Sequence, residues 1–226
     1  AMKQLDDTTA LVLFSGGQDS TTCLYWALQR FEHVHAISFD YGQRHAIETR
    51  QAEKIAKDAG VTLKQLKLSS LAQLGGNALT DDIAVENTVD QKTGLPNTFV
   101  PGRNLFFLTL AGAFAYQVNA KHIVGGMCET DYSGYPDCRQ DFVTHAEQTI
   151  NLAMEAQFQI HMPLMYLDKA ATWQLAKALN CLEVVVNDSN TCYNNDRTHF
   201  HAWGYGCGNC PACELRRAGY ERAFAN

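Results

Sequence analysis

Short apolar runs alternate with segments of helical period through most of this chain, and that alternation limits its fold. The run Ala10–Phe14 is continuously apolar, as in a strand buried on both faces. A helical pattern follows it, with Cys23, Leu24, Ala27 and Leu28 on one face. The same pattern predicts strands at His35–Phe39, Thr62–Leu68, His122–Gly125 and Gln159–Met162, and helices at Ala46–Ala59, Asn104–Gln117, Phe142–Ala156 and Lys169–Leu179. Strands that alternate with helices form parallel βαβ units. We therefore predict an α/β fold: a doubly wound, mainly five-stranded parallel sheet with helices on both faces.

The composition is that of a globular protein, with 46% hydrophobic and 19% charged residues and a formal net charge of −6. This charge argues against a protein that coats nucleic acid. The longest apolar stretch, Leu105–Tyr116, is shorter than the roughly 20 residues of a membrane-spanning helix, so we expect a buried core helix there. Without a secretory pattern, and with many apparently free thiols, the chain is expected in the cytoplasm, with no membrane and no direct nucleic-acid partner.

The segment Ser15–Ser20 (SGGQDS) joins the first predicted strand to the first predicted helix. Its two glycines let the backbone approach a ligand, and the helix that follows presents unpaired N–H groups that suit phosphate. It lacks the lysine of the Walker loop and does not match GxGxxG. A plain tight turn with Asp19 as helix cap is the alternative. Because ligands of doubly wound sheets bind where the strand order reverses, we predict a phosphate site at this turn.

Four of the eight cysteines lie close together near the C-terminus: Cys192, Cys207, Cys210 and Cys213. Four thiolates suit a closed tetrahedral zinc site, and an iron–sulfur cluster takes the same ligands. His199 or His201 could replace Cys192. Three thiols at this spacing rarely serve packing alone, so we predict a metal site that stabilises the fold.

The SGGQDS segment resembles the SGGxDS pyrophosphate loop of the adenine-nucleotide α-hydrolase-like superfamily, whose pyrophosphate-loop ATPases cleave ATP between the α- and β-phosphates. Three further stretches narrow the match: Phe39–His45 (FDYGQRH), Val100–Asn104 (VPGRN) and Asp131–Arg139 (DYSGYPDCR). With the cysteines, they are similar to the 7-cyano-7-deazaguanine synthase family of queuosine biosynthesis. The resemblance spans about Ala10 to Arg217. It says least about Leu71–Asn97, which has no clean period and is expected to be a lid or a partner surface.

The resemblance implies a ligase that uses ATP to convert 7-carboxy-7-deazaguanine and ammonia to 7-cyano-7-deazaguanine, through adenylated carboxylate and amide intermediates. It also implies one structural zinc ion per chain, on the four cysteines, and Mg²⁺ with ATP. We expect a nucleotide-binding domain over residues 1–180, with an insertion at about 71–98, and a zinc-binding segment over 181–226 packed on it. We also expect a homodimer.

The resemblance places ATP on the loop, on the first turns after it and at the end of the second strand. The predicted ATP-binding residues are Phe14, Ser15, Gly16, Gly17, Gln18, Asp19, Ser20, Thr21, Thr22, Cys23, Leu24, Asp40 and Tyr41. The predicted catalytic residues are Asp19, Ser20, Arg103 and Lys169. Arg103 would hold phosphate or close the ATP pocket, with a surface cap as the alternative. Lys169 would stabilise charge on the transferred phosphate, with an exposed lysine as the alternative.

The stretch Asp131–Arg139 is predicted to bind the substrate. Its candidate residues are Asp131, Tyr132, Tyr135, Asp137 and Arg139. A carboxylate there can accept hydrogen bonds from a guanine-like ring, a tyrosine can stack on it, and an arginine can pair with its carboxylate. A solvated loop with a proline turn is the alternative. Cys138 is expected to be a neutral thiol and not a nucleophile, because adenylation needs none from the enzyme.

Two other functions share these motifs. A tRNA-modifying adenylating enzyme of the same superfamily should carry a basic stripe, yet this chain has no Lys/Arg run beyond Arg216–Arg217. A non-catalytic nucleotide-binding or zinc scaffold would be excluded by ATP turnover that depends on a small carboxylate.

Overall fold

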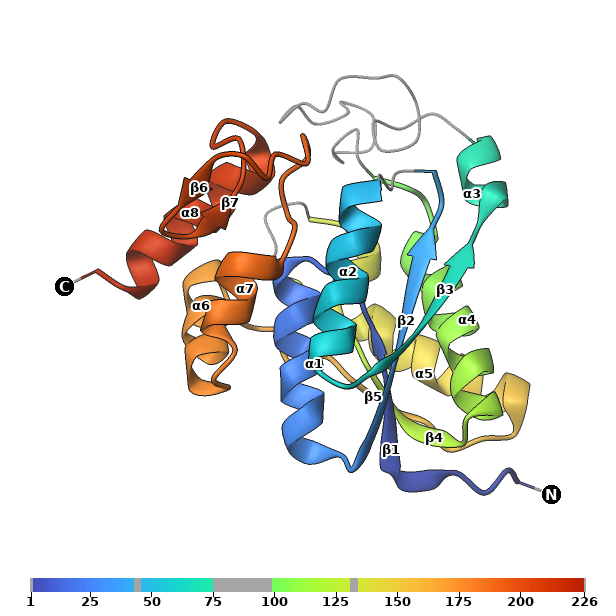
Figure 1. Ribbon diagram of the computed structural model, residues 1–226. Helices are drawn as coiled ribbons and strands as arrows, with labels where there is room; N and C mark the ends of the chain where they lie inside the picture. Colours follow the sequence, from blue (N-terminus) through green and yellow to red (C-terminus); the bar gives the residue numbers. More distant parts are fainter. Residues whose placement is uncertain (1, 43–45, 75–98, 131–133, 226) are drawn as a thin grey trace.

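A computed structural model describes residues 2–42, 46–74, 99–130 and 134–225. A five-stranded parallel sheet, in the order β3-β2-β1-β4-β5, forms its centre (Figure 1). In chain order the elements are β1 (Asp6–Leu13), α1 (Gln18–Arg30), β2 (His33–Asp40), α2 (Ala46–Asp58), β3 (Thr62–Lys67), α3 (Ser69–Leu74), α4 (Arg103–Gln117), β4 (Ala120–Val124), the 3-10 turn η1 (Pro136–Cys138), α5 (Gln140–Met154), β5 (Gln159–His161), α6 (Lys169–Ala178), α7 (Leu182–Asp188), β6 (Phe200–His201), β7 (Gly204–Tyr205) and α8 (Pro211–Ala223). The predicted five strands and their intervening helices are confirmed.

The central strand β1 pairs in parallel with both β2 and β4. Its Leu11 lies opposite His35 on one side and Ile123 on the other. The chain builds β2 and β3 outward from β1 and then returns to place β4 on the opposite side of β1. The strand order therefore reverses between β1 and β4, and their carboxyl ends open a ligand crevice there.

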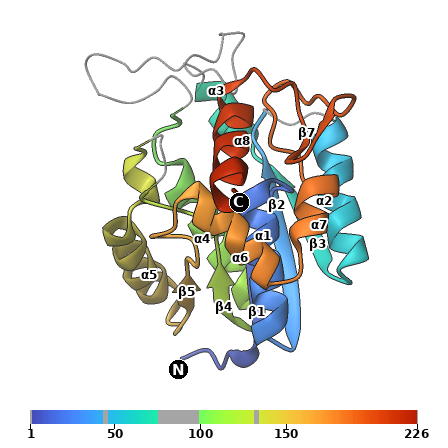
Figure 2. The ribbon, with the colours of Figure 1, turned by 90° about the vertical axis from the view of Figure 1, so that its left-hand side faces the viewer.

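Alternate residues of β1 enter two separate cores, one on each face of the sheet. Leu11 packs in a cluster with Leu108 of α4 and Ile150 of α5. Its neighbours Ala10 and Val12 pack on the other face, in a cluster that α1 and α2 also enter. This period of two on a strand buried on both sides explains the continuous apolar run in the sequence. Figure 2, turned from the view of Figure 1, shows the helices on the two sides of the sheet.

Helix α4 was expected to be a buried core helix, and that expectation is only half right. Leu108 and Ala111 are fully buried against the sheet. Leu105 and Tyr116 of the same helix remain 42% and 37% exposed. A helix that covers one face of a sheet buries one stripe and leaves the opposite stripe outside the core.

The C-terminal part contains elements that the sequence pattern did not predict: α7, the β6–β7 hairpin and α8. A third apolar cluster holds them together around Trp173 of α6. The Trp173 indole N–H donates to the Arg216 carbonyl oxygen of α8 at 3.1 Å. This cluster includes residues on both sides of the predicted boundary at residue 180.

Helix α3 forms the start of the predicted insertion, and residues 75–98 lie outside the described residues. Within the described part of the chain, no helix is long and apolar enough to cross a membrane.

Candidate active site and metal centre

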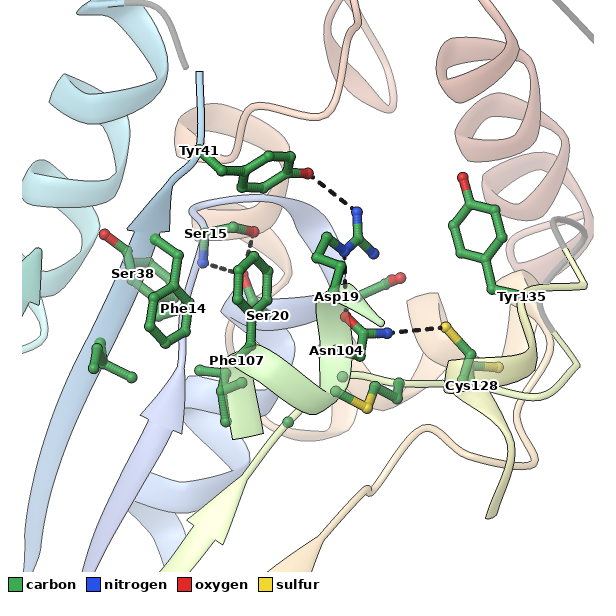
Figure 3. Close-up of a pocket in the computed structure, with 18 residues that line it drawn as sticks. Phe14, Ser15, Asp19, Ser20, Ser38, Tyr41, Asn104, Phe107, Cys128 and Tyr135 are labelled. Carbon is green, nitrogen blue, oxygen red and sulfur yellow. Dashed lines mark hydrogen bonds between the residues drawn. The ribbon is translucent and has the colours of Figure 1, made fainter. Parts of the chain in front are cut away.

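A cavity of about 370 Å³ opens at the carboxyl ends of β1, β2 and β4, where the strand order reverses (Figure 3). Its wall consists of the phosphate loop, the end of β2, the first turn of α4 and the segment after β4. The lining residues are Leu13, Phe14, Ser15, Asp19, Ser20, Ile37, Ser38, Phe39, Tyr41, Arg103, Asn104, Phe107, Gly125, Gly126, Met127, Cys128, Tyr135 and Cys138. The fold therefore has a cavity at the place where the sequence predicts the site.

The predicted phosphate loop wraps tightly around the N-terminus of α1. The backbone N–H of Ser15 donates to Ser20 Oγ at 3.0 Å, and the two serine hydroxyls lie 3.1 Å apart. Gly16 has a φ of +85° in a left-handed conformation, and a side chain there would also press against Ala52 at 3.2 Å. Gly17 caps α1 without a side-chain hydrogen bond. The loop therefore keeps its backbone close to any ligand at the positive end of α1.

The predicted ATP-binding residues divide into two groups. Phe14, Ser15, Asp19, Ser20 and Tyr41 line the cavity. Other predicted residues do not line it and lie on the buried face of α1: Gln18, Thr21, Thr22, Cys23 and Leu24.

Three predicted ATP residues remain. Gly16 and Gly17 belong to the phosphate loop described above, and Asp40 lies at the end of β2. Its Oδ1 accepts a hydrogen bond from the Gly42 backbone N–H at 3.0 Å, which shapes the turn after the strand. Asp40 does not line the main cavity.

Asp19 and Lys169 come from different helices and meet at the edge of the cavity. Lys169 Nζ lies 3.0 Å from Asp19 Oδ1, with the lysine side chain 25% and the aspartate side chain 41% exposed. Asp168 caps α6 by accepting from the Ala171 N–H at 2.7 Å, which fixes where the lysine leaves the helix. The structure thus brings two predicted catalytic residues together.

Arg103 lies inside an aromatic enclosure. Its Nη1 donates to the Tyr41 hydroxyl at 3.1 Å. Its guanidinium carbon lies 6.0, 5.8 and 5.9 Å from the ring centres of Tyr41, Phe107 and Tyr135. Arg103 therefore lines the cavity and is not a surface cap, and it offers a cation to an anionic ligand there.

Only part of the predicted substrate loop can be placed. Asp131 and Tyr132 lie outside the described residues, and Tyr135 lines the cavity. Asp137 is buried, and its Oδ2 accepts from the Asn104 backbone N–H at 3.0 Å. Arg139 is exposed, precedes α5 and does not line the cavity.

Several residues of this wall had no predicted role. Asn104 donates through Nδ2 to the Asp137 carbonyl oxygen at 3.0 Å and to Cys138 Sγ at 3.4 Å, so it ties the predicted substrate loop to α4. Gly125 and Gly126 directly follow β4 and line the cavity. A pair of glycines at the carboxyl end of a predicted strand was a signal for this wall, because it parallels the pair after β1.

The four predicted metal ligands converge. The ligand atoms of Cys192, Cys207, Cys210 and Cys213 all lie within 4.8 Å of one another. Two Sγ–Sγ distances, Cys207–Cys213 and Cys192–Cys210, are both 4.0 Å. Tetrahedral zinc with Zn–S bonds of about 2.3 Å requires sulfur atoms about 3.8 Å apart, so the four thiols fit such an ion.

Backbone N–H groups surround the thiols of this cluster. Cys207 Sγ accepts from the N–H groups of Asn209 and Cys210 at 3.4 and 3.3 Å, and from the Asn194 amide at 3.4 Å. Burial by itself raises the pKa of Cys207, but these hydrogen bonds outweigh it and lower that pKa to about 6. The fold thus favours the thiolate, the form that binds metal, at Cys207, whereas burial raises the pKa of Cys210 and Cys213.

The two histidines considered as substitutes for Cys192 have other partners. His199 Nδ1 lies 2.6 Å from Asp196 Oδ2. His201 stacks on Trp203 with ring centres 4.3 Å apart, and its Nε2 lies 3.0 Å from the Gly206 carbonyl oxygen. Cys192, not a histidine, completes the group of four.

Comparison with known proteins agrees with this geometry. The family described as "Queuosine biosynthesis protein QueC" matches residues 9–224. The chain is 51% identical over 234 residues to the 7-cyano-7-deazaguanine synthase of Methylorubrum extorquens (strain PA1), covering 97% of this chain and 94% of that protein. It is 52% identical over 227 residues to the enzyme of the same name from Nitrobacter hamburgensis, covering 94% and 93%.

Among solved structures, a predicted subunit of tRNA methyltransferase from Methanocaldococcus jannaschii superposes with a TM-score of 0.52 at 19% identity. The match covers 75% of this chain and 76% of that chain. At this identity the likeness shows a shared fold. The agreement of motifs, cavity and close relatives over nearly the whole chain places this protein in the QueC family of queuosine biosynthesis proteins.

Proposed function

We propose that this protein is an ATP-dependent carbon–nitrogen ligase that converts 7-carboxy-7-deazaguanine and ammonia to 7-cyano-7-deazaguanine. One observation carries the proposal: relatives about half identical over nearly the full chain bear the name of this synthase. The cavity supports it, because it joins a phosphate loop to an aromatic, cation-containing wall.

The chemistry explains why one cavity must hold ATP beside a carboxylate. A carboxylate oxygen is a poor leaving group, and its attack on the α-phosphate of ATP releases pyrophosphate and forms an acyl adenylate. Ammonia then displaces AMP and gives the primary amide. A second ATP adenylates the amide oxygen, and loss of AMP and a proton gives the nitrile.

The chain would contribute positioning and electrostatic stabilisation to both adenylations. The phosphate loop and the hydroxyls of Ser15 and Ser20 would hold the phosphates. Lys169, oriented by Asp19, would offset charge that develops on the leaving pyrophosphate. Mg²⁺ bound to phosphate oxygens would supply further charge neutralisation.

The aromatic residues of the cavity wall would hold the adenine ring of ATP and the deazaguanine ring of the substrate. Phe14 and Tyr41, near the ends of β1 and β2, lie on the side proposed for adenosine, and Tyr135 lies on the side proposed for the deazaguanine. Arg103, enclosed by aromatic rings, would face the substrate's carboxylate. Asp131, Tyr132 and Asp137 remain proposed substrate-loop residues. Arg139 was predicted to pair with the carboxylate, but it is exposed outside the cavity wall, so we propose Arg103 for that role instead.

Zinc is the proposed metal of the cysteine cluster, at one ion per chain, because four thiolates suit it and the proposed reaction has no redox step. We also propose a cytoplasmic homodimer. Light scattering coupled to gel filtration would test the dimer, and a molar mass near the 25.1 kDa of one chain would contradict it.

The test of the function is mass spectrometry of the product after incubation with 7-carboxy-7-deazaguanine, ATP, Mg²⁺ and an ammonium salt. We expect the nitrile together with AMP and pyrophosphate. ADP and phosphate as the only nucleotide products would contradict the proposal, as would turnover that requires tRNA.

A further inference from the structure

The segment just before the cysteine cluster touches the phosphate loop. The backbone N–H of Asn190 donates to the Gly16 carbonyl oxygen at 2.9 Å. The N–H of Gln18, the first residue of α1, donates to Thr191 Oγ1 at 3.3 Å. A side-chain carbon built on Gly17 would lie 4.0 Å from the same oxygen. The Thr191 hydroxyl therefore lies at the N-terminus of α1, beside the two loop glycines.

Arg216 of α8 fixes the position of this hydroxyl by a hydrogen bond. The arginine is only 1% exposed, and its Nη1 donates to Thr191 Oγ1 at 2.9 Å and to Ser189 Oγ at 2.8 Å. Its Nε and Nη2 donate at 2.8 Å to the carbonyl oxygens of Trp203 and Val185. With three of its nitrogens bonded inside the protein, the guanidinium has little freedom to move, so the position of Thr191 Oγ1 is fixed.

The Thr191 hydroxyl still has one hydrogen to donate. A threonine hydroxyl carries two lone pairs and one hydrogen. Arg216 and the Gln18 N–H occupy both lone pairs, so the hydrogen must point away from both. Among the described residues, no acceptor takes that hydrogen, although Thr191 is partly exposed. A cationic donor on the oxygen also makes the hydroxyl a stronger donor.

We propose that Thr191 is a phosphate-binding residue of the ATP site, whose hydroxyl donates to an oxygen of the pyrophosphate portion. The inference rests on the proposed function, in that it takes ATP to bind at the phosphate loop. It adds a ligand contact supplied by the C-terminal segment, one residue before the metal ligand Cys192. Phosphate oxygens accept hydrogen bonds readily, and a fixed, polarised donor beside the helix N-terminus is complementary to them.

The test compares isosteric variants of the full-length, metal-loaded protein by calorimetric titration with inorganic pyrophosphate and, separately, with AMP. Thr191→Val keeps the shape and removes the hydroxyl, so pyrophosphate should bind about ten- to a hundredfold more weakly. AMP, which lacks the pyrophosphate portion, should bind as in the wild type. Thr191→Ser keeps the hydroxyl and should stay within about threefold of the wild type for both ligands.

Ser189→Ala is the matched control, because it removes another acceptor of Arg216 Nη1 without touching the loop. It should leave pyrophosphate binding within about threefold of the wild type. Metal content and melting temperature, measured on every variant, separate a folding defect from a binding defect.

Three results would overturn the proposal: unchanged pyrophosphate affinity in Thr191→Val, an equal loss in Ser189→Ala, or an equal loss for AMP. If the wild type binds pyrophosphate in these cases, only the role of Thr191 is refuted and the proposed ATP site is not. A wild-type protein that binds neither pyrophosphate nor ATP would refute both.

Discussion

At the scale of single residues, two cations lie in different surroundings, Arg103 in the cavity wall and Lys169 at the cavity's edge. Lys169 is paired with Asp19 at 3.0 Å and stays partly exposed. Arg103 is enclosed by aromatic faces and bonded to the Tyr41 hydroxyl. The surroundings of Lys169 suit a group that stabilises the negative charge developing on a leaving phosphate. Those of Arg103 suit the binding of a planar anion such as a carboxylate.

Asp19 and Lys169 should act as a coupled pair. Lys169→Met should lower turnover about a hundredfold, because it removes a charge aimed at the leaving pyrophosphate. Asp19→Asn should cost a similar factor if the aspartate serves to orient the lysine. The double variant should then lose no more than Lys169→Met alone. Initial rates of AMP formation measure this, and additive losses would show that the two residues act independently.

The roles of Arg103 and Arg139 can be distinguished by comparing the carboxylate substrate with the amide. Arg103→Ala should lower kcat/KM about ten- to a hundredfold for the carboxylate and less for the synthetic amide, because a neutral amide forms no charge-assisted pair with a guanidinium. Arg139→Ala, at an exposed site outside the cavity wall, is the matched control and should change both little. A carboxylate-specific loss confined to Arg139→Ala would give this role to Arg139.

At the scale of elements, β4 and β5 are joined by more than backbone pairing. His122 Nδ1 of β4 lies 2.9 Å from His161 Nε2 of β5, and His122 Nε2 lies 3.0 Å from Asp7 Oδ1 of β1. Burial lowers the pKa of His161 below its ordinary value of 6.5, and the neighbouring His122 and Arg30 lower it further. The pKa of the exposed Asp7 carboxyl is also lowered, chiefly by its hydrogen bond with His122.

Acid should therefore destabilise this edge of the sheet. A histidine whose pKa is lower in the folded than in the unfolded chain takes up its proton more readily after unfolding. Its stabilising effect is thus present above pH 6.5 and is lost as the pH falls toward the folded-state pKa. The melting temperature should fall more steeply below pH 6.5 in the wild type than in His161→Gln. His145→Gln, at an exposed ring on α5, is the control and should follow the wild type. Parallel curves for the wild type and His161→Gln would assign the acid sensitivity elsewhere.

At the scale of the whole molecule, the cysteine cluster fixes a C-terminal segment that reaches back to the phosphate loop. The bond from Asn190 to Gly16 and the bond from Gln18 to Thr191 lie within two residues of Cys192. Helix α8 begins at the cluster, because Cys210 caps it by accepting from the Cys213 N–H at 3.4 Å. A loss of metal should thus weaken ligand binding at the proposed ATP site, although no cysteine of the cluster lines the cavity.

Cys210→Ser should lose the metal, lower the melting temperature and weaken pyrophosphate binding together, since removal of a ligand from a closed site leaves the others under-coordinated. Elemental analysis of the wild type should give about one zinc per chain. Cys181→Ala, at a fully buried thiol outside the cluster, should keep the metal. Stoichiometric iron with visible absorbance would contradict zinc, and a metal-free Cys210→Ser protein that keeps full pyrophosphate affinity would contradict the coupling.

The sequence by itself determined the sheet and the position of the site. Apolar runs such as Ala10–Phe14 are typical of a strand buried on both faces, and the SGGQDS segment joins this strand to the helix that follows. The spacing Cys207-x2-Cys210-x2-Cys213 likewise predicted a shared metal site, because local spacing brings such thiols together. These features depend on contacts between neighbours in sequence or on a repeating period, which a sequence displays directly.

Only the tertiary structure decided which residues of distant segments meet. Asp137 became a buried acceptor for Asn104, Arg139 came to lie outside the cavity wall, and Lys169 met Asp19 across 150 positions. The bonds of Arg216 and Gln18 to Thr191 also join segments far apart in the chain. Such contacts depend on how the helices pack against the sheet, and neither the hydrophobic period nor the composition of the sequence predicts that packing.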